Sequence, residues 1–462
     1  MKNNSGKRAS FLYLIATLFN KGIVFLTVPI FTKLLSTSDY GIVSTYNSWI
    51  DILTVLLSLA LYMAIRTAFV DYEKKTDSFF NTIITFTLLF SSVIGLIVLL
   101  VCACIWKESI VLVVCAMLQG TASAMLMDYT QYLMMDFQYI RRSFYMATPN
   151  FIATVLSVVV IALVPMGDKY MGRIIPTMIV YVFFGSTILF KTYNKSKPTI
   201  NKQYLSYGLR ISLPLVLHGA ALSILSQSDR TMITVLVGSS QTGIYSLVYN
   251  FGMIATVLTT AMDGIWLPWF MSKMKCERYD EINQRAVDYI KVMTCAMIGI
   301  ILVGPEILKF LADKKYWAGL NIIPAIVLAN YIIFVYNFYV NAEHYYKKTA
   351  SITTNTIIAA CCNIGLNFIF IPKYGYVAAA FTTVASYAIA LLLHARCSRK
   401  LQKMLFPPTQ FIKVGAVLLF GVLLYYMVID YWIVRWILCV MIILVMIYKE
   451  RKKILNYLRV KR

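Results

Sequence analysis

The chain has 462 residues, of which 60% are hydrophobic and only 14% are charged, and its mean hydropathy is +0.71. Soluble globular proteins carry about 25% charged residues, so this composition excludes a soluble domain and indicates a polytopic membrane protein. The formal net charge of +23 does not indicate nucleic-acid binding. Basic residues of membrane proteins gather instead in cytoplasmic loops, where they face anionic lipid headgroups.

Apolar runs along the chain predict an all-α polytopic fold, because a membrane-spanning helix needs about 20 apolar residues. No alternation typical of a β-barrel accompanies them. Fourteen such runs are found, at residues 11–35, 40–64, 79–104, 109–134, 146–165, 171–190, 211–237, 243–267, 287–304, 318–341, 352–371, 375–395, 410–428 and 431–448.

The distribution of basic residues predicts the orientation of these helices. With the N-terminus in the cytoplasm, 32 of the 43 Lys and Arg residues fall in cytoplasmic segments, nine fall outside and two fall within spans. Both termini are therefore expected in the cytoplasm, with an even number of helices. Twelve helices satisfy the same rule, and the last two runs are then the additional pair.

An internal repeat divides the chain. The stretch Thr32–Ser44, reading TKLLSTSDYGIVS, returns 202 residues later as Thr234–Ser246, reading TVLVGSSQTGIYS. Each copy is a polar turn between two apolar runs, so one helix–turn–helix unit opens each half. The identical pairs are Thr32/Thr234, Leu34/Leu236, Ser38/Ser240, Gly41/Gly243, Ile42/Ile244 and Ser44/Ser246.

The repeat predicts two six-helix lobes followed by a terminal helix pair. An even number of helices gives both lobes the same orientation, as in parallel repeats around an axis along the membrane normal. Such repeats indicate a transporter with a central cavity between its lobes. The expected parts are an N-terminal lobe at 1–195, a cytoplasmic linker at 196–204, a C-terminal lobe at 205–400, and a terminal pair with a basic cytoplasmic tail at 401–462.

Charged residues within spans are the best indicators of a functional site, because a charge at the bilayer centre costs about 2.5–3.5 kcal/mol on insertion scales. Lys21 lies near the middle of the first run, and Asp229 and Arg230 lie in the seventh. Ser226 and Thr234 share a helical face with Arg230. This polar face is expected to line a cavity. The alternative is a structural ion pair that holds helices together.

Three further residues are candidates near the ends of spans. Arg66 follows the second run and is expected at the rim of the inner mouth, or as an anchor whose head reaches the interface. Asp263 lies in the eighth run. His218 lies early in the seventh, where it either takes a proton near neutral pH or packs as a hydrogen-bonded neutral ring.

Motifs for enzymatic chemistry are absent from the sequence. It contains no GxxxxGK[ST] loop, no HExxH, no GxSxG and no acidic metal cluster, and its nine cysteines include no CxxC pair. The chain is therefore not expected to be an enzyme or to hold a metal or another cofactor. The expected energy source is an ion gradient, the membrane potential or the substrate gradient.

The opening stretch NKGIVFLTVPIFTKLLSTSDYGIVSTYNSW resembles the N-terminal signature of bacterial polysaccharide flippases of the Wzx type. These belong to the multidrug/oligosaccharidyl-lipid/polysaccharide (MOP) exporter superfamily. The family pattern is an apolar helix, a Pro-Ile-x-Thr-[Arg/Lys]-Leu-Leu-Ser element and a Tyr-Gly turn. The second-half elements SDRTMI and GIYS also resemble the family. The matching residues are Pro29, Ile30, Thr32, Lys33, Leu34, Leu35, Ser36, Tyr40 and Gly41.

The resemblance implies a flippase in the bacterial cytoplasmic (inner) membrane that turns an undecaprenyl-diphosphate-linked oligosaccharide from the cytoplasmic to the outer leaflet by alternating access. The sugar head would enter a cationic cavity containing Lys21, Arg66 and Arg230, since diphosphate recognition needs cations. Asp229, Asp263 or His218 would carry a coupling H⁺ or Na⁺ or line the cavity. Implied partners are the lipid-linked oligosaccharide, membrane lipids and polysaccharide polymerase or assembly proteins; nucleic acid is not one.

Three alternative functions remain open from the sequence. An ion-coupled drug or cation exporter of the same superfamily would favour acidic cavity residues, whereas Lys21 and Arg230 are basic. A flippase for the lipid-linked peptidoglycan precursor would share the fourteen helices and the cationic cavity. A scaffold for a polysaccharide assembly complex would not depend on its charged intramembrane residues.

Overall fold

The computed structural model describes residues 22–23, 25–73, 75–105, 110–165 and 167–460. These residues are almost wholly helical and include no β-strand, which confirms the predicted all-α fold. In chain order the elements are α2 (Thr37–Ser58), α3 (Leu61–Asp71), α4 (Thr76–Ile105), α5 (Ile110–Met135), α6 (Tyr139–Leu163), α7 (Met171–Lys195), α8 (Lys202–Val237), α9 (Ser239–Lys275), α10 (Tyr279–Leu311), the 3₁₀ helix η2 (Lys314–Ile322), α11 (Ile323–Tyr345), α12 (Thr349–Leu401), α13 (Pro408–Met427) and α14 (Trp432–Val460).

The helices coincide with the apolar runs predicted from the sequence. Ten segments of the described chain are long and apolar enough to cross a membrane, and α12 alone covers two predicted runs. The shorter apolar helices Phe25–Leu34, Phe411–Met427 and Trp432–Val445 fall on the remaining runs. The terminal pair predicted at the last two runs is thus helical as well.

Helix α12 reverses direction at Gly375. A straight helix of its 53 residues would be about 80 Å long, far beyond the ~30 Å hydrocarbon core. Gly375 has φ 64° and ψ −150°. Glycine adopts this backbone conformation readily, whereas residues with a Cβ atom rarely do. The Thr382 hydroxyl donates to the side-chain Oδ1 atom of Asn367, fifteen residues earlier. This contact requires the chain to fold back on itself.

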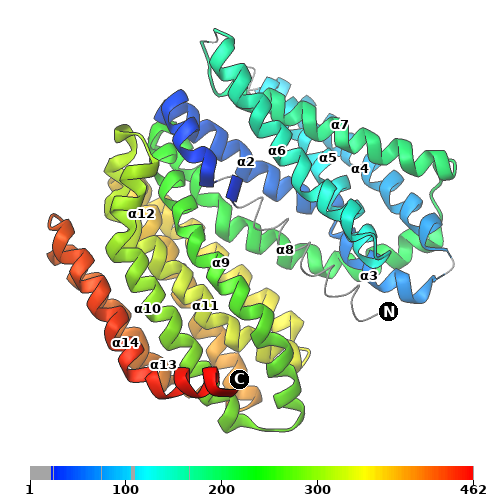
Figure 1. Ribbon diagram of the computed structural model, residues 1–462. Coiled ribbons are helices and arrows are strands. Elements are labelled where there is room, and N and C mark those ends of the chain that lie inside the picture. Colours follow the sequence, from blue (N-terminus) through cyan, green and yellow to red (C-terminus); the bar gives the residue numbers. More distant parts are fainter. Residues whose placement is uncertain (1–21, 24, 74, 106–109, 166, 461–462) are drawn as a thin grey trace. The chain divides into compact units, whose positions relative to one another are not determined.

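The chain forms two compact units, Met1–Gly243 and Ile244–Arg462. In the first unit α5 is central and packs against α2, α3, α4, α6 and α7, as the neighbouring ribbons in Figure 1 show. Helix α8 packs against α2, α3 and α4 and so belongs to this unit by its contacts. The sequence repeat, in contrast, begins again just before the end of α8.

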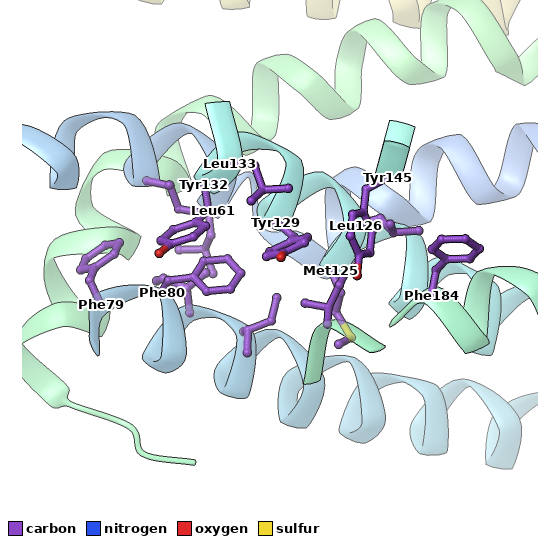
Figure 2. Close-up of a cluster of buried hydrophobic side chains, with 14 of the residues drawn as sticks. Leu61, Phe79, Phe80, Met125, Leu126, Tyr129, Tyr132, Leu133, Tyr145 and Phe184 are labelled. Carbon is purple, nitrogen blue, oxygen red and sulfur yellow. The ribbon is translucent and has the colours of Figure 1, made fainter. Parts of the chain in front are cut away.

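Aromatic side chains make up much of the core of the first unit (Figure 2). Phe80 of α4 lies 4.5 Å from Tyr132 of α5 between ring centroids, and Tyr129 lies 4.9 Å from Tyr145 of α6 in an edge-on arrangement. Aromatic pairs at such distances add about 0.5–1.5 kcal/mol beyond the area that they bury. The cluster therefore fastens α4, α5 and α6 together at one end of the bundle.

The polar turn of the repeat starts α2 with a capping box. The Ser36 hydroxyl accepts from the Asp39 backbone N–H at 3.0 Å, and the Asp39 carboxylate accepts from the Ser36 backbone N–H at 3.1 Å. These bonds satisfy backbone donors that the first helical turn leaves without partners. The polar residues of the turn thus have a local structural role.

A break between α2 and α3 interrupts one of the apolar spans. Leu59 and Ala60 both adopt left-handed backbone conformations, with φ of 46° and 52°. The Ser58 hydroxyl accepts from the Ala60 backbone N–H at 3.2 Å and so satisfies one of the donors released by the break. Membrane helices tolerate such breaks where neighbouring polar groups satisfy the backbone.

The second unit packs around an aromatic cluster of its own. Trp266 of α9 is buried and meets Phe338 of α11 edge-on, with 4.7 Å between ring centroids. Phe406, just before α13, stacks on Phe270. On α14, Arg435 is 2% exposed and pairs with Glu306 of α10 at 2.5 Å. This ion pair joins the terminal helix pair to the rest of the unit.

Candidate functional site

Four of the six sequence-predicted site residues lie in the first unit and one lies in the second. Asp229 and Arg230 are buried in α8, with 1% and 6% of their surface exposed. His218 is half-buried earlier in α8, eleven residues before Asp229, or about 16 Å along the helix. Asp263 is half-buried in α9 of the second unit. Lys21 lies outside the described residues.

Arg230 is held by groups of its own helix. Its Nη1 atom donates to the Ser226 carbonyl at 3.2 Å and to Gln227 Oε1 at 2.5 Å. The predicted polar face of α8 therefore forms as expected from the helical spacing. An arginine presents five donors in a planar fork, which suits it to bind two acceptors at once.

The polar face of α8 packs along α2 as a polar seam, defined here by residues 45–51 of α2 and residues 226–234 of α8. Thr45 and Thr234 share a hydrogen bond of 2.7 Å. Trp49 Nε1 donates to the Thr231 hydroxyl at 3.0 Å, and Ser48 donates to Gln227 at 3.2 Å. The seam satisfies its own polar groups, as buried polar groups in a membrane must.

Asp51 joins the polar seam and was missed by the sequence reasoning. Gln227 Nε2 donates to Asp51 Oδ2 at 2.9 Å, so one amide bridges the carboxylate of α2 and the guanidinium of α8. Asp51 is exposed although it lies within a spanning helix. A carboxylate at membrane depth faces water or a partner rather than lipid. The signal that selected Arg230, a charge inside an apolar run, applied equally to Asp51.

Arg66 is separate from the polar seam. It is exposed on α3 and its Nη2 atom donates to Gln131 Oε1 of α5 at 3.3 Å. One turn before Gln131, Asp128 is fully buried and accepts from the Thr87 hydroxyl at 3.2 Å. The structure thus places the three candidates Asp229, Arg230 and Arg66 at two positions in the first unit.

The second unit contains two polar clusters that were not selected as site residues. Glu343 of α11 and His394 of α12 are both buried and lie 3.0 Å apart between Oε1 and Nδ1. The amides of Asn363 and Asn367, with Thr382, form a second buried group within the α12 hairpin. A single Asn or His within an apolar run changes the hydropathy of that run little, so hydropathy alone does not identify these residues as a site.

Metal binding is not indicated within the described residues. They contain no group of three or more His, Cys, Asp or Glu side chains placed to hold a metal ion. All nine cysteines are free thiols. The charged and polar groups of the first unit are instead suited to hydrogen bonding with a polar or anionic ligand.

Comparison with known families identifies the chain. Residues 7–274, more than half of it, match the family model described as Polysaccharide biosynthesis protein. The chain belongs to this family. A Lsg locus protein of Haemophilus influenzae is 23% identical over 390 residues, covering 80% of this chain and 94% of that protein. The Staphylococcus aureus capsular polysaccharide biosynthesis protein CapF is 24% identical over 194 residues, which are 39% of this chain and 47% of CapF.

Solved structures show the same fold. The lipid II flippase MurJ in an inward closed conformation matches with a TM-score of 0.72 at 17% identity, over 96% of this chain and 100% of that one. An inward-facing MATE family multidrug transporter of the MOP superfamily matches with a TM-score of 0.58 at 13% identity, over 87% and 95%. The resemblance to polysaccharide flippases predicted from the sequence is confirmed at the level of this family, and the chain is a multi-pass membrane protein that shares the fold of these two structures.

Proposed function

We propose that this member of the polysaccharide biosynthesis family turns an undecaprenyl-diphosphate-linked oligosaccharide from the cytoplasmic leaflet to the outer leaflet by alternating access. The transporter fold and the family membership support transport rather than catalysis. The oligosaccharide would supply a repeat unit for a surface polysaccharide. The protein would act in the bacterial inner membrane with both termini in the cytoplasm, as its basic residues predict.

The burial of Arg230 inside a membrane-spanning helix is the observation that carries this proposal. Arg230 carries a guanidinium and is 6% exposed. An arginine guanidinium can bind a phosphate group through two hydrogen bonds at once. In the structure Arg230 donates to the amide oxygen of Gln227, whose amide nitrogen donates to Asp51. A diphosphate that reaches the polar seam would replace the amide oxygen of Gln227 as the acceptor.

The other predicted site residues have supporting roles in the proposal. Arg66 would attract the anionic headgroup at the cytoplasmic end of the path, and Lys21 would add a second cation. Asp229, Asp263 or His218 would couple the cycle to H⁺ or Na⁺. The two six-helix lobes at 1–195 and 205–400 remain the proposed moving parts.

The decisive experiment measures the leaflet in which the lipid-linked oligosaccharide resides. Cells that lack the gene are compared with cells that carry the wild-type gene, Arg230→Gln or Arg210→Gln. Arg210 is an exposed residue of the same helix, so its variant controls for the loss of one positive charge. We expect cytoplasmic accumulation in the absence of the gene and with Arg230→Gln, and export with the wild type and Arg210→Gln.

Other results would redirect the assignment. An unchanged leaflet distribution in cells lacking the gene would refute the flippase function and favour a drug or cation exporter. Accumulation of the peptidoglycan precursor instead would assign the protein to that lipid. Full export with Arg230→Gln would refute the role of the arginine while leaving the flippase function in place.

A further inference from the structure

A second site lies in the first unit, away from the polar seam. A cavity of about 290 Å³ opens where α4 begins and α5 and α7 end. This is the end of the bundle that the charge distribution predicts to be cytoplasmic. Its rim carries the basic side chains of Arg141, Lys191 and Lys195, together with Asp77.

The rim is positively charged overall. Asp77 pairs with Lys195 at 3.2 Å and also accepts from the Tyr132 hydroxyl. With three basic side chains and one carboxylate, the rim has a net charge of about +2. Arg141 donates to the neutral amide of Gln138 at 2.7 Å. These side chains are therefore placed to bind an anion, and the exposed positions of Arg141 and Lys191 leave them accessible to one.

The floor of the cavity is aromatic and buried. It consists of Phe80, Tyr129 and Tyr132, each less than 10% exposed, which Figure 2 shows side by side. Lys191 bonds the Tyr145 hydroxyl at 2.9 Å and lies 5.0 Å from the centre of that ring. A rigid aromatic floor beneath a basic rim resembles the interfacial anchors that hold lipid headgroups.

A separate apolar groove lies further along the same helices. It has a volume of about 340 Å³ and is lined by residues of α4, α5 and α7. On α5, Met125 of the groove precedes Tyr129 of the cavity by one turn, or about 6 Å. On α7, Leu189 of the groove is followed by Lys191 of the rim. The cavity and the groove therefore follow one another along α5 and α7.

The groove faces the bilayer. The outer surface of α4 beside it carries exposed apolar residues, among them Leu89, Val93 and Ile97, within a span of mean hydropathy 2.7. Lipid acyl chains thus reach the groove directly. The basic rim at the membrane surface is complementary to the anionic phosphate of a phospholipid, and the apolar groove below it is complementary to the acyl chain.

We propose that this cavity and groove bind one anionic phospholipid of the cytoplasmic leaflet, with the phosphate on Arg141, Lys191 and Lys195 and an acyl chain between α4, α5 and α7. The cavity holds a phosphodiester headgroup, whereas an oligosaccharide of several rings exceeds its volume. The bound lipid fastens α7 to α4 at the end of the unit. This inference does not depend on the proposed substrate.

The test measures lipid binding to the purified full-length protein by native mass spectrometry. Phosphatidylglycerol is compared with phosphatidylcholine of the same acyl chains. The triple variant Arg141→Gln/Lys191→Gln/Lys195→Gln is matched by Lys347→Gln/Lys348→Gln/Arg396→Gln, which removes three exposed charges from the second unit. We expect the first variant to lose phosphatidylglycerol affinity by about tenfold or more, because it removes three basic residues that attract the anionic phosphate. The control retains it.

A second pair of variants tests the groove independently of charge. Ser92 lines the groove on α4, whereas its neighbour Val93 is exposed outside it. Ser92→Phe is expected to fill the groove and weaken binding of both lipids, while Val93→Phe leaves both unchanged. Equal phosphatidylglycerol binding by the two triple variants would overturn the proposal. So would equimolar polyprenyl phosphate displacing phosphatidylglycerol from the wild type, because the site would then belong to the transport substrate.

Discussion

Gly41 of α2 and Gly243 of α9 each lie against the backbone of the other's helix. A Cβ atom on Gly41 would lie 1.8 Å from the Ser239 carbonyl oxygen, and one on Gly243 would lie 2.0 Å from that of Thr37. These two contacts are equivalent under the 202-residue repeat. The two copies of the repeated turn therefore meet each other, within the first unit, around a local two-fold relationship.

Hydroxyl pairs repeat this relationship. Thr37 bonds Ser240 at 2.7 Å, and Ser38 bonds Ser239 at 2.6 Å. The 202-residue offset converts one pair into the other. The polar residues shared by the two copies are thus explained by their mutual contact, and the glycines by the closeness of the two backbones.

Alanine at either glycine is predicted to destabilise the protein. Gly41→Ala and Gly243→Ala each force a backbone shift, which we expect to cost about 2 kcal/mol or more because overpacking typically costs 1–3 kcal/mol. The measurement is unfolding of the purified protein in detergent. Gly264→Ala, in α9 with nothing within 4 Å of its Cβ position, serves as the control. Wild-type stability of both variants would contradict the close contact.

The bridge through Gln227 predicts coupled effects on transport. Gln227→Leu removes the group that links Asp51 to Arg230, so it is expected to impair export of the lipid-linked oligosaccharide as Arg230→Gln does. The double variant should be little worse than either single variant, because residues of one network are not additive. Export is followed by the leaflet assay. Multiplicative losses would show that the two side chains act separately.

The buried pair of Glu343 and His394 predicts a measurable coupling energy. Replacing either residue alone by Leu leaves its partner buried without its hydrogen bond, and we expect a loss of about 3 kcal/mol in each case. Replacing both should cost at least 1 kcal/mol less than the sum of the two. Chemical unfolding in detergent measures the cycle. Strict additivity would mean that the two side chains do not interact.

The reversal at Gly375 predicts a position-specific need for glycine. Gly375→Ala places a side chain at φ 64° and ψ −150°, which is expected to cost about 1–3 kcal/mol. Gly365→Ala is the matched control, because it lies in the same helix with helical geometry and an open Cβ position. The control should be neutral or up to about 1 kcal/mol more stable. Thermal unfolding distinguishes the two, and equal midpoints would argue against the reversal.

The sequence alone was sufficient to predict the class of the protein, its helices and its family. Hydropathy is a sum over neighbouring residues, so a run such as 79–104 predicts α4 without knowledge of its partners. Helical spacing likewise placed Ser226 on the face of Arg230, and the structure shows their hydrogen bond. These are local properties, which the order of residues determines directly.

Only the tertiary structure decided which helices meet. Asp51 joins Gln227 from a helix 176 residues earlier, the repeated turns meet through Gly41 and Gly243, and the basic rim of the lipid site unites α4, α6 and α7. Such contacts depend on how apolar helices pack against one another, and many pairings of apolar helices satisfy the same hydropathy. Side-chain shape, small residues and polar partners select one pairing. These contacts depend on which helices are packed together, so the local sequence does not determine them.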